Sequence, residues 1–308
     1  MRWVLSRQPD VRVLVPKRLR DRVAEKMRQA LGTGSERKGK EAMPKYDHII
    51  WDWNGTLFDD AELCVQILNG VLSRRARPTV THAQYMQVFG FPVRDYYRRL
   101  GLDFSSEPFE TIATEWMSEY QRRRCECGLQ PHARAVLGAC CEAGLDQSIL
   151  SAYSHDALEE VVTDCGLRAF FTALVGLGDH YADSKLENGR RFMAERGLAG
   201  KRVAFVGDTI HDFEVARALG LDCALIPSGH HTRDRLESCG VPLLDGLREV
   251  LGFVGVSARR SLRPRPNSEI ATSAATPPSG HLPRARSASG RRGKSERKSP
   301  SRQTDVGQ

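Results

Sequence analysis

The chain has 308 residues and a net charge of +8, with 46 Lys and Arg against 38 Asp and Glu. That length allows one large domain or two smaller ones plus tails. Residues 1–45 carry 13 basic against 5 acidic side chains and residues 257–308 carry 12 against 3, which leaves 21 against 30 in residues 46–256. Positive charge suited to nucleic acid or an acidic partner therefore belongs to the tails alone.

The sequence also argues against several compartments and site types. No apolar run approaches the roughly 18 residues of a membrane span, and the first residues lack the apolar stretch and cleavage site of a signal peptide. Eight cysteines form no pair of C-x-x-C units, so a structural zinc site is not indicated. We therefore expect a cytoplasmic protein with no membrane partner; the oligomeric state is left open.

Both ends of the chain have the composition of tails. Residues 1–45 form a basic extension that we expect to be poorly ordered, although Pro16 marks an alternative helix start for residues 17–31. Met43 stands just before the first apolar strand, which gives the hypothesis that it is the native start. Residues 255–308 are rich in Ser, Arg, Pro and Gly and are predicted to be disordered.

Between the tails, β-type apolar runs alternate with helical patterns. Alternation with short loops is typical of a parallel sheet covered by helices on both faces. We predict an α/β, doubly wound, Rossmann-like core from residues 46–60 and 131–254. Its strands are expected at residues 48–53, 148–152, 173–177, 202–206, 223–226 and 241–244, and its helices at 133–143, 156–165, 185–196 and 211–219.

Residues 61–130 interrupt this alternation. They contain helical patterns at residues 61–74, 82–89, 94–100 and 109–124, with no convincing series of strands. A helical cap inserted after the first strand accounts for this gap. The core is therefore expected to be discontinuous in sequence.

Ligands of open α/β sheets bind outside the carboxyl ends of the strands. The first strand is followed by Asp52, Asn54 and Thr56 in the segment DWNGTL. Ser151 ends the second strand, and Lys185 begins the helix before the fourth. That fourth strand leads into GDTIHD, which contains Asp208 and Asp212. One carboxylate, one hydroxyl, one amine and an acidic pair are thus predicted to converge on one edge.

This set resembles the haloacid dehalogenase superfamily, in the phosphoglycolate-phosphatase-like branch with a helical cap, over roughly residues 46–254. The resemblance implies that Asp52 is a nucleophile that forms an aspartyl phosphate. It implies that Asp208, with Asp212 supporting it, binds Mg²⁺ together with Asp52 and the backbone carbonyl of Asn54. The expected substrate is a small phosphorylated metabolite, with phosphoglycolate the first guess.

The remaining residues of the set receive their roles in the same way. Ser151 is expected to donate a hydrogen bond to the phosphoryl oxygens and Lys185 to neutralise their charge. Thr56 is expected to help hold the loop beside Asp52. A structural reading stands beside the functional one, because Thr56-x-x-Asp59, Ser184-x-x-Glu187 and Thr209-x-x-Asp212 all fit helix capping boxes or close variants.

Asn54 departs from the family pattern. Phosphatases of this family usually carry Asp there, which protonates the leaving group and then activates water. An amide cannot exchange a proton near neutral pH. This leaves a slow phosphatase, another proton carrier such as His155 or His211, or a longer-lived aspartyl phosphate suited to transfer. It also favours the alternative function, a catalytically weak or inactive relative that binds a phosphorylated ligand or a partner.

The cap is expected to select the substrate. The segment Gly90-Phe91-Pro92-Val93-Arg94 resembles a cap specificity loop, and Arg94 is the candidate for binding a substrate carboxylate or second phosphate. Arg98 and Arg99 are read as a solvated helix face. Phosphonate-cleaving relatives use a cap lysine, and residues 61–130 contain none. Dehalogenases need no metal, so Asp208 and Asp212 argue against that activity.

Overall fold

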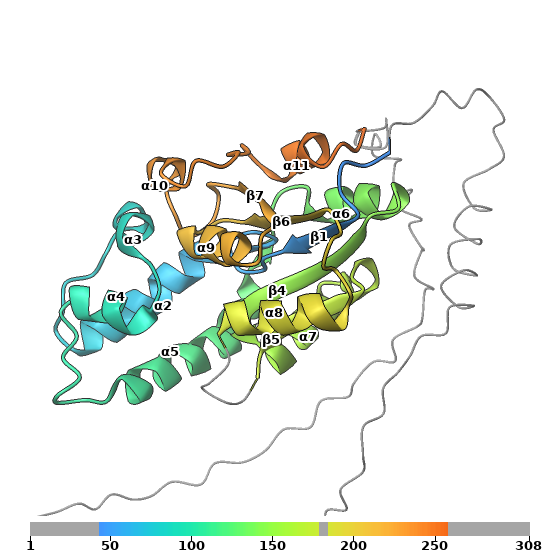
Figure 1. The fold of residues 1–308 in the computed structure, drawn as a ribbon. Helices are drawn as coiled ribbons and strands as arrows, with labels where there is room; N and C mark the ends of the chain where they lie inside the picture. Colours follow the sequence, from blue (N-terminus) through green and yellow to red (C-terminus); the bar gives the residue numbers. More distant parts are fainter. Residues whose placement is uncertain (1–42, 179–183, 258–308) are drawn as a thin grey trace, which may run out of the picture. The chain divides into compact units, whose positions relative to one another are not determined.

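The computed structural model describes residues 43–178 and 184–257. The alternative helix at residues 17–31 and all of the predicted tail beyond residue 257 lie outside these ranges. The core is a five-stranded parallel sheet with the strand order β5-β4-β1-β6-β7 (Figure 1). Its strands are β1 (His48–Trp51), β4 (Asp146–Ser154), β5 (Ala173–Leu177), β6 (Val203–Gly207) and β7 (Asp222–Leu225).

Helices cover both faces of this sheet because successive side chains of a strand point to opposite faces. On β1, Ile49 and Trp51 belong to one buried cluster and Ile50 to the other. The first cluster includes side chains of α6 (Ala133–Glu142), α7 (His155–Asp164) and α11 (Leu247–Phe253). The second includes side chains of α8 (Lys185–Glu195), α9 (Ile210–Ala218) and α10 (Arg233–Glu237). The predicted α/β fold class is confirmed.

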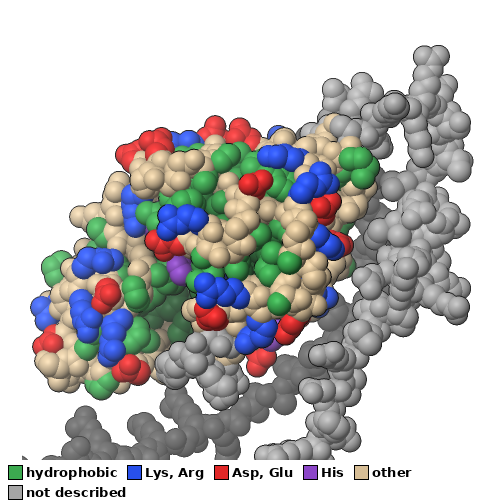
Figure 2. Space-filling model, in the orientation of Figure 1, with side chains coloured by type: hydrophobic (Ala, Val, Ile, Leu, Met, Phe, Trp, Pro, Cys, Tyr) green, Lys and Arg blue, Asp and Glu red, His purple; other side chains and the backbone are tan. Residues whose placement is uncertain are grey.

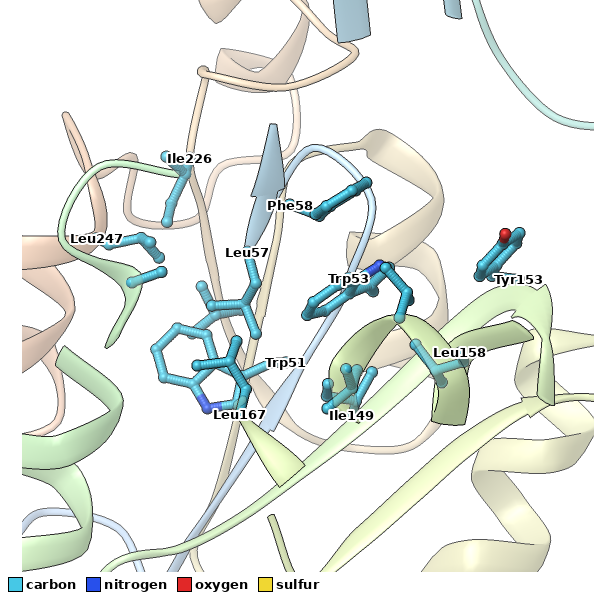
Figure 3. Close-up of a cluster of buried hydrophobic side chains, with 14 of the residues drawn as sticks. Trp51, Trp53, Leu57, Phe58, Ile149, Tyr153, Leu158, Leu167, Ile226 and Leu247 are labelled. Atoms are coloured by element: carbon cyan, nitrogen blue, oxygen red, sulfur yellow. The ribbon is translucent and has the colours of Figure 1, made fainter. Parts of the chain in front are cut away.

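Figure 3 shows how the first cluster is filled beneath the loop that follows β1. Trp51, Trp53 and Leu57 are fully buried there, beside Ile149 of β4 and Leu158 of α7. Fully burying a large apolar side chain stabilises the fold by about 1.5–3 kcal/mol. The loop that carries Asp52 and Asn54 is therefore fixed by apolar anchors on both sides of each polar residue.

The cap lies between β1 and β4 in the sequence and consists of α2 (Ala61–Arg74), α3 (His82–Val88), α4 (Val93–Arg99) and α5 (Phe109–Arg123). Helix α2 packs against α5 and α3. A two-stranded antiparallel ribbon of β2 (Phe58–Asp59) and β3 (Gly128–Leu129) joins cap and core, and the sequence did not indicate it. Short 3₁₀ turns occupy Arg124–Glu126 and Arg168–Phe170.

One predicted strand is wrong. Residues 241–244 form no strand, and Leu243 makes only an isolated bridge to Leu225 of β7. Leu225 donates to the carbonyl of Pro242 and Leu244 donates to the carbonyl of Leu225, so a single residue of β7 takes up both bonds. Pro242 has no N–H to extend such a ladder. None of the described helices has the length and apolar character needed to cross a membrane.

Candidate active site

Asp52 follows the central strand and meets Lys185, the first residue of α8. The Lys185 Nζ lies 2.5 Å from Asp52 Oδ1 and 2.5 Å from Asp212 Oδ1, and all three side chains are buried. Ser184 fixes the start of α8, because its hydroxyl accepts a hydrogen bond from the Glu187 N–H at 3.2 Å. Residues 52, 185 and 212, far apart in sequence, thus form one chain of charges at the carboxyl edge of the sheet.

The pKa values of Lys185, Asp52 and Asp212 are shifted in different directions. Burial by itself would lower the pKa of Lys185, but the carboxylates of Asp212 and Asp52 outweigh it and raise that pKa. Burial raises the pKa of Asp52 to about 8, against the opposing effect of Lys185. The pKa of Asp212 is lowered, because Lys185 and Thr209 outweigh the effect of its burial. At Asp52 the effect of burial outweighs that of the single ammonium, and further positive charge beside it would favour the carboxylate form that a nucleophile needs.

Asp212 is both a helix cap and a charged partner. Its Oδ2 accepts hydrogen bonds from the N–H groups of Asp208 and Thr209, and Thr209 and Asp212 form a complete capping box at the start of α9. Its Oδ1 faces Lys185. The capping alternative for Thr209-x-x-Asp212 is thus present together with the charged contact. The capping box proposed for Thr56-x-x-Asp59 is absent, because no helix starts at Thr56. The Thr56 hydroxyl instead donates to Asp208 Oδ1 at 2.9 Å.

The three carboxylates Asp52, Asp208 and Asp212 offer oxygens that lie within 4.8 Å of one another. Asp208 follows β6, the neighbour of β1, and burial raises its pKa to about 6. Lys185 contacts two of these three buried carboxylates, Asp52 and Asp212, which leaves negative charge that a divalent cation would offset. Oxygen donors in this arrangement suit Mg²⁺. A second group with ligand atoms this close is Asp60, Cys64 and His230.

Asn54 is held by two residues that the sequence reasoning missed. Its amide nitrogen donates to Asp60 Oδ2 at 2.8 Å and to the Tyr120 hydroxyl at 2.7 Å, and Tyr120 itself donates to Asp60 Oδ2 at 2.7 Å. The amide oxygen is the atom left to accept a hydrogen bond from a bound molecule. Asp60 is buried, and its hydrogen bonds with His230, Tyr120 and Asn54 outweigh burial and lower its pKa. The carboxylate of Asp60 thus lies against the Asn54 amide.

His230 connects this group to the cap. Its Nδ1 lies 3.0 Å from the Tyr85 hydroxyl of α3, and its backbone N–H donates to Asp208 Oδ2 at 2.7 Å. Burial opposes its protonation, but Asp60 outweighs burial and raises the pKa of His230 to about 9. Gly55 makes room for the ring: it has φ +77°, and a Cβ there would lie 2.7 Å from His230 Cδ2. Inspecting the residues after β7, as for the other strands, would have found His230.

A cavity of about 310 Å³ lies between this group and the cap. Its core side is lined by Asp52, Asn54, Ser151, Lys185 and Asp212. Figure 2 shows hydrophobic side chains gathered in the hollow between the cap and the core. Asp208 and Thr56, which are 0% exposed, are absent from the lining and lie behind it. Thr56 donates to Asp208 Oδ1, and Asp208 Oδ2 accepts from the His230 N–H.

Of the remaining predicted residues, Arg94 and His155 lie outside the cavity, whereas His211 lines it. Arg94 does not line the cavity: its guanidinium lies over the rings of Phe104 and Phe109 and pairs with Glu110 at 3.7 Å. His155 is exposed at the start of α7. His211 does line the cavity, where its ring lies 4.7 Å from that of Phe91, and burial lowers its pKa.

Comparison with known proteins places these features in context. A family model described as haloacid dehalogenase-like hydrolase matches residues 49–226. The chain is 28% identical over 190 residues to a phosphoglycolate phosphatase of Synechococcus elongatus, covering 61% of this chain and 87% of that protein. It is 24% identical over 216 residues to the tyrosine-protein kinase PtkA of Mycobacterium tuberculosis, covering 66% of this chain and 72% of that protein.

Solved structures share the fold. The crystal structure of a predicted phosphoglycolate phosphatase from Haemophilus somnus matches with a TM-score of 0.60 at 17% sequence identity. The match covers 69% of this chain and 99% of that one. At this identity the likeness concerns the fold alone.

Proposed function

The chain belongs to the haloacid dehalogenase-like hydrolase family, and from this premise we propose that it is a Mg²⁺-dependent phosphatase. It hydrolyses a small phosphomonoester through an aspartyl phosphate on Asp52. The observation that carries this proposal is the contact of Lys185 Nζ with both Asp52 and Asp212, 2.5 Å from each, on the core side of the cavity. Relatives named phosphoglycolate phosphatase make phosphoglycolate the first substrate to test.

Magnesium fits the excess of buried carboxylates. Asp52, Asp208 and the backbone carbonyl of Asn54 would hold the ion, and Asp212 would hold Lys185 and the loop beside it. When bound, Mg²⁺ offsets the negative charge of the carboxylate and the phosphate that must approach each other. It also lowers the pKa of a carboxylate that binds it. The raised pKa of Asp52 is thus expected to fall when the cation binds.

The reaction follows from the placement of the side chains. A carboxylate oxygen of Asp52 attacks phosphorus, the bond from phosphorus to the ester oxygen breaks, and that oxygen takes up a proton from water. Lys185 and the hydroxyl of Ser151 stabilise the charge on the phosphoryl oxygens. Water then attacks phosphorus, the bond to Asp52 breaks, and inorganic phosphate leaves with Asp52 regenerated.

Asn54 sets the expected rate. General acid–base help is typically worth about 10²–10⁴-fold in rate, and an amide cannot supply it. Both described hydrogen bonds of the Asn54 amide nitrogen go to the protein, so its oxygen orients a water or a leaving oxygen without moving a proton. We therefore propose slow hydrolysis and a longer-lived aspartyl phosphate than in relatives with Asp at this position.

That lifetime favours a second candidate function, transfer of the phosphoryl group to an acceptor hydroxyl. One relative has the name tyrosine-protein kinase, which agrees with a transfer activity. A third candidate is a phosphate-binding protein without turnover, which the same Asn54 favours. All three use the same site and differ in the fate of the phosphoryl group after it has bound.

A panel of phosphate esters separates these candidates. Purified full-length protein is assayed for phosphate release with Mg²⁺ and with a chelator, alongside Asp52→Asn. Hydrolysis predicts release that requires both Mg²⁺ and Asp52. Transfer predicts that release is slow and that an added alcohol acceptor becomes phosphorylated. Saturable binding of inorganic phosphate without any turnover would leave only the binding function.

A further inference from the structure

The cavity has two chemically different sides. On the core side lie the charged and polar groups of the proposed phosphate site. The side formed by described cap residues 61–130 contains no charged side chain. Its aromatic members include Phe89, Phe91, Tyr96, Phe109, Trp116 and Tyr120.

The cap arginines are directed elsewhere. Arg94 packs on Phe104 and Phe109, Arg98 pairs with Asp95 at 2.8 Å, and Arg99 donates to the Val88 carbonyl at 3.3 Å. None of the three lines the cavity. Among the described lysines, Lys185 is the one that does, and it already contacts two carboxylates. His230 also lines the cavity and has a raised pKa, but it pairs with Asp60 at 3.5 Å. A substrate carboxylate placed against the cap side would therefore lose water without gaining an unpaired cation, which is unfavourable.

The aromatic side chains form ordered pairs. Trp116 and Tyr120 are stacked, with ring centroids 5.1 Å apart and planes at 12°. Phe89 meets Tyr96 edge to face at 5.4 Å. Rings in such arrangements present both faces and edges to a further ring. The volume of about 310 Å³ lies within the range of small-molecule sites, about 300–1,000 Å³.

We infer that the substrate is a small phosphomonoester whose leaving alcohol carries an uncharged ring, rather than a short carboxylate such as glycolate. The inference rests on the proposed phosphatase function for the position of the phosphate. With phosphate on the core side, the leaving group extends toward the cap. Trp116, on α5, is the specificity-determining residue that we single out, because it lines the cavity and is only partly buried.

Two matched esters test this inference. Benzyl phosphate and phosphoglycolate both release a primary alcohol, so they differ mainly in carrying a ring or a carboxylate. We expect kcat/KM with Mg²⁺ to be at least about tenfold higher for benzyl phosphate, the scale of discrimination by an apolar pocket. Binding of their non-hydrolysable analogues, benzylphosphonate and phosphonoacetate, is measured in parallel by calorimetry and should show the same order.

Three variants locate the preference. Trp116→Ala should weaken benzylphosphonate binding about tenfold and leave inorganic phosphate binding unchanged. Phe104→Ala is the control, because it removes an aromatic ring of the same cap that does not line the cavity. Met117→Lys adds a cation to the cap side and should shift the preference toward phosphonoacetate. Circular dichroism and thermal unfolding of each variant test whether the cap remains folded.

The outcomes separate the inference from the proposed function. Equal or tighter binding of phosphonoacetate by the wild type overturns the inference even if both esters are hydrolysed. So does an equal loss of benzylphosphonate binding in Phe104→Ala and Trp116→Ala. Tighter, Trp116-dependent binding of benzylphosphonate supports the inference even if no ester is hydrolysed, in which case only the phosphatase function fails.

Discussion

The core side of the cavity is lined by ionisable side chains in contact, and the cap side by uncharged aromatic and apolar side chains. On the core side, Asp52, Lys185 and Asp212 are buried ionisable groups in contact with one another. On the cap side, uncharged rings such as Trp116 and Phe89 pack against neighbouring aromatic rings. Breaking a buried ion pair leaves an uncompensated charge, whereas an apolar wall tolerates exchange of similar side chains. We therefore expect substitutions on the core side to cost more activity than substitutions on the cap side.

The largest expected effect is that of Asp52→Asn. Enzymes accelerate their reactions at least about 10⁶-fold, and removing the nucleophile should remove at least about 10⁴-fold of this. Phosphate release in single-turnover and steady-state assays is the measurement. Asp59→Asn, which changes an exposed carboxylate of β2, is the matched control and should keep full activity. Activity of Asp52→Asn equal to wild type would contradict the mechanism.

Lys185→Met should lower kcat by about 10²–10³-fold, the usual loss when one preorganised charge-stabilising group is removed. It also leaves Asp52 and Asp212 without their shared cation, so thermal unfolding should occur at lower temperature. Lys201→Met provides the control, because Lys201 is exposed. If Lys185→Met loses no more activity than Trp116→Ala, the expected difference between the core side and the cap side is contradicted.

Asn54 and Asp60 should respond as a pair. In the wild type the Asn54 amide nitrogen lies 2.8 Å from Asp60 Oδ2. Asn54→Asp alone puts a carboxylate oxygen at about that position, and this should lower the free energy of unfolding by about 1–3 kcal/mol. The swap Asn54→Asp with Asp60→Asn restores an amide beside a carboxylate, and should raise turnover by about 10²-fold. Chemical denaturation and phosphate release of both single variants and the double variant measure the coupling. Additive effects would show that the two residues act independently.

The smallest effect on turnover is expected at His48, at the opposite end of β1 from Asp52. Its Nε2 lies 2.8 Å from Ser148 Oγ, and burial lowers its pKa to about 4 from 6.5. Between pH 6.5 and 4 the unfolded chain therefore binds more protons than the folded one. Stability falls by about 1.4 kcal/mol for each unit that the pH is lowered within that window, and above it this contribution is constant.

His48→Gln should reduce this acid-side slope without changing kcat at pH 7.5. Denaturation midpoints at several pH values, compared with those of wild type, measure the change. His155→Gln, at an exposed histidine, should retain the wild-type slope. A fall in kcat for His48→Gln would contradict the view that chemistry is confined to the carboxyl edge of the sheet.

Local patterns predicted much of this molecule. The apolar runs gave the parallel strands, and the four helical patterns of residues 61–124 correspond to α2, α3, α4 and α5. The strand-end rule brought Asp52, Ser151, Lys185 and Asp212 to one cavity, because all parallel strands end at the same edge. Residues 241–244 were misassigned, since an apolar run around Pro242 looks like a strand until its partners are known.

The sequence by itself determined the α/β fold class and the residues at the strand ends, since strand period, helix caps and the direction of parallel strands are local properties. Only the tertiary structure decided that Asp60 and Tyr120 hold Asn54, and that His230 meets Tyr85 of the cap. It also decided that Arg94 packs away from the cavity. These contacts join residues far apart in the chain, and which partner each side chain meets depends on side-chain packing across the folded molecule.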